Sequence, residues 1–143
     1  MDLNHLMETA QQLKQPDAET VAEYSRQKDH LLSQINRLMS EREDIETMIG
    51  KGNHAMMRDN HHNHIQFMES VFLLTKPEVL VETVVWVFKV YRSRGFLPTY
   101  WAAQLSSWKI VLENALSNKA FAEIWPFYQW MIVNTPVFSK LSE

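Results

Sequence analysis

Histidine side chains offer the most obvious chemistry in this sequence. On a helix, His54 and His61 would share one face, and His64 follows His61 by about one turn. Two imidazoles three residues apart can converge on one metal ion, and beside an apolar wall they can hold a haem or a similar planar cofactor. We therefore take His54, His61 and His64 as candidate metal ligands, and His61 and His64 as candidate cofactor ligands.

The histidine cluster lacks the other parts of a metal site. A third ligand usually completes such sites, and helical di-metal proteins repeat Glu-x-x-His, a pattern that this chain does not contain. The nearest carboxylates are Asp59 and Glu69. We favour hydrogen-bonded, partly buried histidines without a resident cofactor. Their packing could respond to pH, because imidazoles titrate near neutrality.

The sequence offers little support for either phosphotransfer or enzymatic catalysis. Histidine phosphotransfer proteins are four-helix bundles of similar length, and His30 or His64 could accept the phosphoryl group here. None of the six histidines, however, belongs to the His-x-x-Lys-Gly pattern of that family. The chain also has no glycine-rich phosphate loop, no Gly-x-Ser-x-Gly turn and no metalloprotease motif. We predict that the protein is not an enzyme.

Aromatic residues concentrate in the second half of the chain, where Trp86 is a further candidate for contact with a cofactor. Tyr24 is the only Phe, Trp or Tyr before residue 66. Aromatic residues at helical spacing either line a ligand pocket or form the core, and we favour the core because each ring removes a large area from water. The aromatic set is Trp86, Tyr91, Tyr100, Trp101, Trp108, Trp125, Tyr128 and Trp130.

Composition narrows the class of protein. The absence of cysteine excludes disulfides, thiolate zinc sites and cysteine nucleophiles. The net charge is −3 and there is no basic block, so nucleic-acid binding is not expected. The longest apolar stretch, from Val79 to Tyr91, is far shorter than the roughly 20 residues that cross a bilayer. The N-terminus does not resemble a signal peptide, and we expect a cytoplasmic protein without membrane contact.

A seven-residue repeat is the clearest pattern that could position these residues. Two apolar series, offset by three, run through residues 20–49 and resemble the a and d positions of a coiled coil. We predict that they form a homodimer interface; packing of the same stripe on the chain's own second half is the alternative. The interface residues are Val21, Tyr24, Lys28, Leu31, Ile35, Leu38, Arg42, Ile45 and Ile49.

The chain is expected to be all-α, with a long N-terminal coiled-coil helix followed by a four-helix bundle. Glycine is rare, and no alternating strand-like pattern occurs. The predicted segments are a short amphipathic helix within 1–15, a coiled-coil helix over 17–50 and a helical bundle over 54–143. In the bundle, helices begin near His54, Pro77, Pro98 and Ser117. Thr75 to Glu78 is read as a capping box, Gly95 as a helix end, and Pro126 as a break or kink.

Residues 58–135 resemble a helical domain found next to cobalamin-binding modules in bacterial regulatory proteins. The resemblance is carried by Asn63 to Ser70 (NHIQFMES), Pro77, Val84, Trp86 and Arg94-Gly95. The chain has no Asp-x-His-x-x-Gly segment, which supplies the cobalt ligand in that family, so cobalamin binding is not implied. The resemblance implies a bacterial sensory or signal-relay setting, with His64 and Trp86 as the matched positions.

Together these features predict a non-catalytic bacterial signalling or regulatory module. It would combine a dimeric coiled coil with a helical sensor or protein-docking bundle, and it would act on a protein partner in a signalling pathway. The alternatives are a histidine phosphotransfer protein and a haem- or metal-binding sensor that uses His61 and His64.

Overall fold

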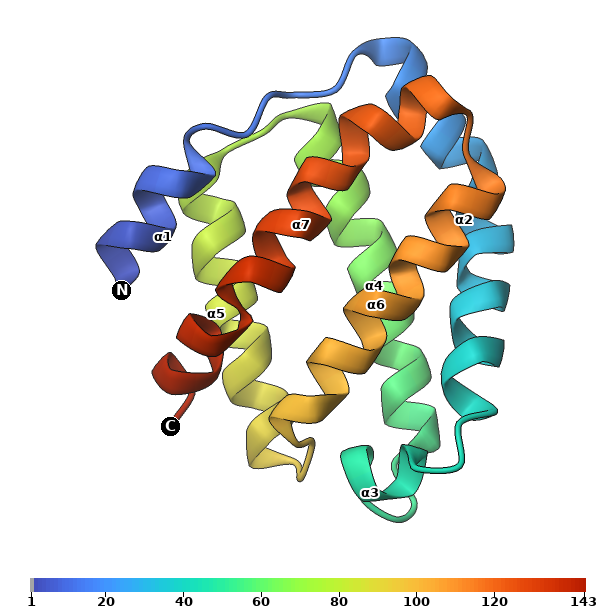
Figure 1. Ribbon diagram of the computed structural model, residues 1–143, viewed down its shortest axis with the longest axis vertical. Coiled ribbons are helices and arrows are strands. Elements are labelled where there is room, and N and C mark those ends of the chain that lie inside the picture. The colour runs from blue at the N-terminus through green and yellow to red at the C-terminus, as the bar shows by residue number, and fades with distance from the viewer. Residues whose placement is uncertain (1) are drawn as a thin grey trace.

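The computed structural model describes residues 2–143 and confirms the all-helical prediction. Within this range there are seven helices and no strand: α1 Leu3–Ala10, α2 Ala18–Ser40, α3 Ile45–Ile49, α4 His54–Leu73, α5 Pro77–Ser93, α6 Pro98–Ala115 and α7 Asn118–Leu141. In Figure 1, α6 and α7 lie in front of α4 and α5, with α2 on one side and α1 on the other. Every helix contributes to one hydrophobic core.

Local signals in the sequence account for most helix ends. The side chains of Asp2, Asp17 and Ser117 each accept a hydrogen bond from the backbone N–H three residues later, as N-caps do. Pro77 and Pro98 occupy the first turns of α5 and α6, where the missing N–H costs no hydrogen bond. Helix starts are therefore set by short-range chemistry.

The end of α5 is a Schellman motif built around a glycine. The Phe96 N–H donates to the Tyr91 carbonyl at 3.0 Å, and the Gly95 N–H donates to the Arg92 carbonyl at 3.1 Å. Gly95 has a φ of 98°, a region that side chains with a Cβ rarely adopt. The Tyr91 and Phe96 rings pack edge to face with centroids 5.0 Å apart, which supplies the apolar contact typical of this motif.

Two local predictions need correction. The N-cap of α5 is Lys76, without a side-chain cap, and the Thr75 hydroxyl donates back to the Val71 carbonyl, so no capping box forms. Helix α7 continues from Asn118 to Leu141, so Pro126 does not break it, and a kink there stays a prediction. Tertiary packing compensates for the lost backbone hydrogen bond there, because the next residues, Phe127 and Tyr128, are fully buried.

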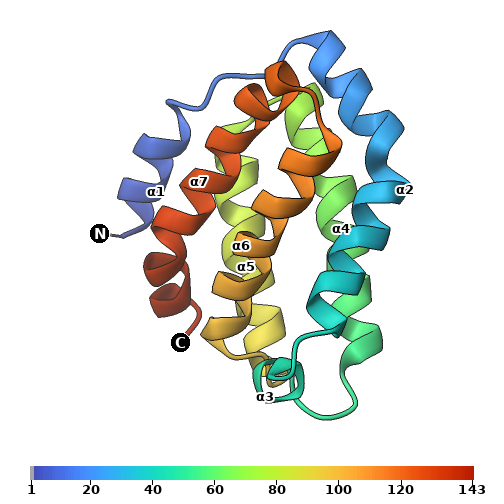
Figure 2. The same cartoon turned by 45° about the vertical axis from the view of Figure 1, so that its right-hand side comes forward.

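The heptad stretch forms two helices instead of one. Helix α2 ends at Ser40, and the polar segment 41–44, in which Arg42 Nε pairs with Asp44 Oδ1 at 2.9 Å, leads to the short α3. The break turns α3 across the end of the molecule, as Figures 1 and 2 show. Ile45 and Ile49 thereby reach the core, where both are buried.

The predicted coiled-coil stripe packs inside a single copy of the chain. Helix α2 lies against α4, α6 and α7, and its apolar positions are covered by them. The Tyr24 hydroxyl donates to the Ile65 carbonyl at 3.2 Å, and Lys28 Nζ pairs with Glu69 Oε1 at 3.0 Å. The buried positions are Val21, Tyr24, Leu31, Ile35, Ile45 and Ile49, whereas Leu38 is partly buried and Lys28 and Arg42 reach solvent.

The internal packing limits the surface that a homodimer through residues 20–49 could use as its interface. Pairing through the apolar stripe would require α2 and α3 to leave their own core. Such a homodimer stays a prediction, and the surface open to it is the exposed face of α2 together with the polar segment 41–44.

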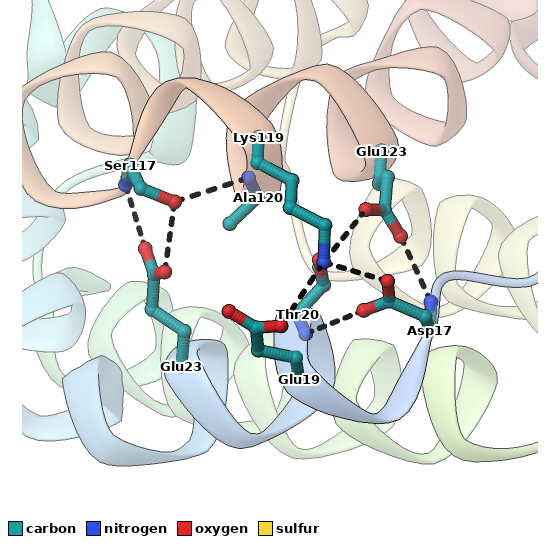
Figure 3. A network of polar contacts seen from close by, with 8 residues as sticks. All are labelled: Asp17, Glu19, Thr20, Glu23, Ser117, Lys119, Ala120 and Glu123. Carbon is teal, nitrogen blue, oxygen red and sulfur yellow. Dashed lines mark hydrogen bonds and ion pairs between the residues drawn. The ribbon is translucent and has the colours of Figure 1, made fainter.

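Ion pairs join the start of α2 to the start of α7, as Figure 3 shows. Lys119 Nζ lies 2.6 Å from Asp17 Oδ2, and it also approaches Glu19 at 3.5 Å and Glu123 at 3.6 Å. Beside them, the Glu23 carboxylate accepts hydrogen bonds from the Ser117 N–H and hydroxyl at 2.6 and 2.8 Å. These contacts align two helix N-termini that are a hundred residues apart.

Candidate functional site

A pocket of about 350 Å³ lies between α4, α5 and α6 and is closed on one side by Met131 of α7. This volume falls within the roughly 300–1,000 Å³ typical of small-molecule sites. Its wall is mostly apolar and includes Phe67, Met68, Val84, Val87, Leu105 and Met131. The site therefore suits a ligand with an apolar body.

Helix α5 forms the outer wall because its main packing partners lie on its other side. It packs on α1 and α7. Leu6 and Ala10 of α1 are fully buried, and the Trp130 Nε1–H of α7 donates to the Thr9 hydroxyl at 2.9 Å, which holds α1 in place. Trp86, on the pocket side of α5, remains 62% exposed. The pocket is thus the gap left between α5 and the inner helices.

A network of polar side chains lies at the inner wall. Gln104 is only 2% exposed and lines the pocket. Its amide nitrogen donates to Asn60 Oδ1 at 2.7 Å and to the Tyr100 hydroxyl at 3.1 Å. Its amide oxygen has no hydrogen-bond partner within residues 2–143. Because Gln104 lines the pocket, this oxygen can accept a hydrogen bond from a ligand or from water.

The network continues away from the pocket to His61, which is fully buried. His61 Nδ1 lies 2.7 Å from Asn36 Oδ1, and Nε2 lies 3.1 Å from the Tyr100 hydroxyl. Since Asn36 Oδ1 can only accept, the neutral ring carries its proton on Nδ1. The single Tyr100 hydroxyl hydrogen is donated to Asn60 Oδ1 at 2.7 Å, and His61 Nε2 is the alternative acceptor for it. Burial lowers the pKa of His61 to about 3, with a smaller contribution from the neighbouring His64.

His64 faces the pocket and is held by rings from α6 and α7. Its Nε2 lies 2.8 Å from the Tyr128 hydroxyl, and its ring centroid is 5.0 Å from that of Trp108. Burial lowers the pKa of His64 and raises that of Tyr128, so both groups are neutral near pH 7. His64 therefore presents a neutral imidazole to the pocket.

The three candidate metal ligands are not brought together. His61 is committed to Asn36 and Tyr100, His64 to Tyr128, and His54 Nε2 lies 3.7 Å from Glu46 Oε1 near the molecular end that carries α3. Across residues 2–143, no group of three or more His, Cys, Asp or Glu side chains is placed to hold a metal ion. His30, the other phosphotransfer candidate, is exposed on α2.

The two positions matched by the family resemblance line the same pocket, and the resemblance itself stays a prediction. His64 of α4 and Trp86 of α5 both line the pocket, although they are 22 residues apart. Sequence reasoning missed Asn60, Gln104 and Arg94 as pocket residues. Gln104 had a detectable signal, because it interrupts the apolar face that runs through Trp101, Leu105 and Trp108.

Charge in the pocket comes from one residue. Among the side chains of residues 2–143 that line it, Arg94 is the only permanently charged one, and none is a carboxylate. Arg94 makes no ion pair with the described residues. Burial raises the pKa of Tyr91, and the positive charge of Arg94 opposes that rise, so the guanidinium acts close to the Tyr91 hydroxyl. The pocket therefore has a cation without an ion pair among the described residues, at the C-cap of α5.

Comparison with known proteins returns no relative: no family model, curated protein or solved structure matches the chain. No helix in the described range 2–143 is long and apolar enough to cross a membrane.

Proposed function

We propose that the protein is a non-catalytic sensor module of a regulatory system, and that the pocket between α4, α5 and α6 binds its small-molecule signal. The observation that carries this proposal is the pocket itself, with its apolar wall, the unpartnered acceptor of Gln104 and a free Arg94. Convergent polar groups in an apolar cavity are what small-molecule sites share.

The chemistry of the wall favours binding over catalysis. A hydrolytic or acid–base site needs a nucleophile or base held by an orienting partner. Within the described range the lining holds no carboxylate, and its one imidazole has Nε2 hydrogen-bonded to Tyr128. A neutral, hydrogen-bonded ring of this kind positions a ligand and does not transfer its proton near pH 7.

Helix α5 is the element through which a signal would pass. A ligand that fills the pocket favours the arrangement of α5 that contacts it best, and this differential affinity shifts the population of arrangements. Because α5 also packs on α1 and α7, a shift of α5 changes the contacts of α1. A partner protein would read the surface made by α1 and the exposed face of α5.

The pocket can be tested with a pair of tryptophan substitutions. Val87→Trp places a large ring in the pocket, whereas Ile110→Trp adds the same ring on α6 at a position that is 52% exposed and outside the lining. With 1-anilinonaphthalene-8-sulfonate as the fluorescent probe, we expect saturable binding by the unmodified protein and by Ile110→Trp, and its loss in Val87→Trp. Equal binding by the two variants would rule out this pocket.

The sensory role has its own readout. Hydrogen exchange measured with and without saturating probe should change in α1 and α5, the helices that the proposal couples. If exchange changes only in residues that touch the pocket, the protein binds the probe without passing a change to α1. That result would contradict the sensor proposal.

A further inference from the structure

The polar and apolar groups of the pocket are separated along its length. Helices α4 and α6 run in one direction and α5 runs in the other, as Figure 1 shows. Asn60 near the start of α4 and Arg94 at the end of α5 therefore lie at one end, while Met68 and Val84 lie at the other. With a rise of about 1.5 Å per residue, the eight residues from Asn60 to Met68 span roughly 12 Å.

Each end of the pocket has a distinct character. Arg94 and Asn60 both act on the Tyr91 hydroxyl, and Gln104 donates to Asn60 beside them. The carboxylate of Asp59 also acts on that hydroxyl, but Asp59 is exposed and does not line the pocket. The opposite end is formed by Phe67, Met68, Val84 and Met131, which carry no charge. An elongated ligand would thus place a polar head near Arg94 and an apolar tail between α4 and α5.

The charge of the lining selects the head group. One free guanidinium with no carboxylate among the described lining residues favours an anion over a cation. A single cation matches a monoanion better than a doubly charged phosphate monoester. We propose that the ligand is an amphipathic monocarboxylate of the medium-chain fatty-acid class, an inference that rests on the proposed sensor function. Its carboxylate would lie at Arg94 and its chain along Phe67, Met68 and Val84.

A head-group series tests this assignment. Decanoate, decanol and decyltrimethylammonium share one chain length and differ in charge, and their dissociation constants can be measured by calorimetry below their micellar concentrations. We expect the order decanoate, decanol, decyltrimethylammonium from tightest to weakest. The methyl signals of Met68 and Met131 and the Nε–H signal of Arg94 should shift together when decanoate is added, because tail and head contact opposite ends.

Two matched arginine variants measure what the charge of Arg94 contributes to ligand binding. Arg94→Gln should weaken decanoate binding about fivefold, the effect of one partly exposed ion pair, and leave decanol unchanged. The backbone carbonyl of Arg94, which accepts from Asn53 Nδ2 at 3.1 Å, is unaffected by this change. Arg26→Gln, at an exposed position of α2 outside the pocket, should alter the binding of neither ligand.

The outcomes separate this inference from the sensor proposal. If decanol binds as tightly as decanoate, or if Arg94→Gln and Arg26→Gln behave alike, the carboxylate assignment fails while the pocket remains. If decanoate binds equally well to the protein with Val87→Trp, then the chain does not occupy this pocket and both proposals fail. Circular dichroism melting of each variant verifies that it is folded.

Discussion

His61 and Tyr100 face each other in the buried centre of the protein. Their rings are nearly parallel, at 11°, with centroids 6.4 Å apart, and His61 Nε2 lies 3.1 Å from the Tyr100 hydroxyl. Tyr100 in turn contacts Asn60 and Gln104, which line the pocket. A histidine on α4 is thereby linked to the ligand pocket through a tyrosine on α6, and its protonation is coupled to the fold.

The first prediction concerns acid stability. His61 has a pKa of about 3 in the fold against 6.5 for an ordinary histidine, so only the unfolded chain takes up a proton between these values. The stabilisation from a neutral His61 is complete above pH 6.5 and is lost as pH falls toward 3, by about 1.4 kcal/mol per pH unit. Urea unfolding measured from pH 7.5 to pH 4.5 should show this slope, to which His64 adds in the same direction.

The pH dependence has a control in the adjacent residue. His61→Gln removes the His61 titration and should reduce the slope to the part contributed by His64, whereas His62→Gln, at an exposed position, should leave it unchanged. Identical slopes for the two variants would mean that burial of His61 does not govern the acid response.

The second prediction concerns the hub of the polar network. Tyr100→Phe leaves His61 Nε2 and one hydrogen of Gln104 without a partner in a fully buried site, so we expect a loss of about 1–3 kcal/mol in the free energy of unfolding. Tyr91→Phe is the matched change at the pocket, where no hydroxyl contact is shared with His61. A loss in Tyr91→Phe as large as that in Tyr100→Phe would contradict the central role of Tyr100.

The third prediction concerns α2. Ile35 is 0% exposed, packed within its own chain, and Ile35→Ala should cost about 2–5 kcal/mol. Ile110→Ala, on the surface of α6, should stay within about 0.5 kcal/mol of the unmodified protein. The melting temperature of Ile35→Ala should not depend on protein concentration, because the contact is intramolecular. A concentration-dependent melting temperature would instead indicate that this stripe joins two copies.

The fourth prediction concerns the ion pairs of Figure 3. The hydrogen bond from Lys119 lowers the pKa of Asp17, and the same pair raises the pKa of Lys119. Lys119→Gln should lower the melting temperature slightly at low ionic strength, and the difference should vanish at about 1 M salt, where exposed charges are screened. Lys109→Gln, which disrupts the 3.9 Å pair with Glu113 and a contact over the Trp125 ring at 5.8 Å, should have a smaller effect. A salt-independent difference would point to lost packing of the lysine stem.

Local signals predicted the helices after residue 53 well. Prolines at positions 77 and 98 and the glycine at position 95 act through their own backbone geometry, so their effect can be read without knowing the fold. The failures arose where the fold overrides a local preference. Helix α7 continues past Pro126 with buried neighbours on both sides of it, and α2 stops at Ser40, after which α3 places Ile45 and Ile49 in the core.

The pocket was only partly visible in the sequence. His64 and Trp86 were predicted from their residue types. Gln104 was missed, although a polar residue on an apolar helix face is a signal that the sequence contains. Arg94 resembled any other exposed cation at a helix end. Its place in the pocket follows from the antiparallel course of α4 and α5, which brings it to the same end as Asn60.

The sequence by itself determined that this chain is helical, which face of each helix is apolar and where most helices begin and end. These properties depend on hydrogen bonds and steric contacts between residues a few positions apart. Tertiary structure alone decided what each apolar face meets. A heptad stripe packs equally well on a second copy or on α4 and α6, because burial of apolar surface has no direction and depends only on which surface is at hand.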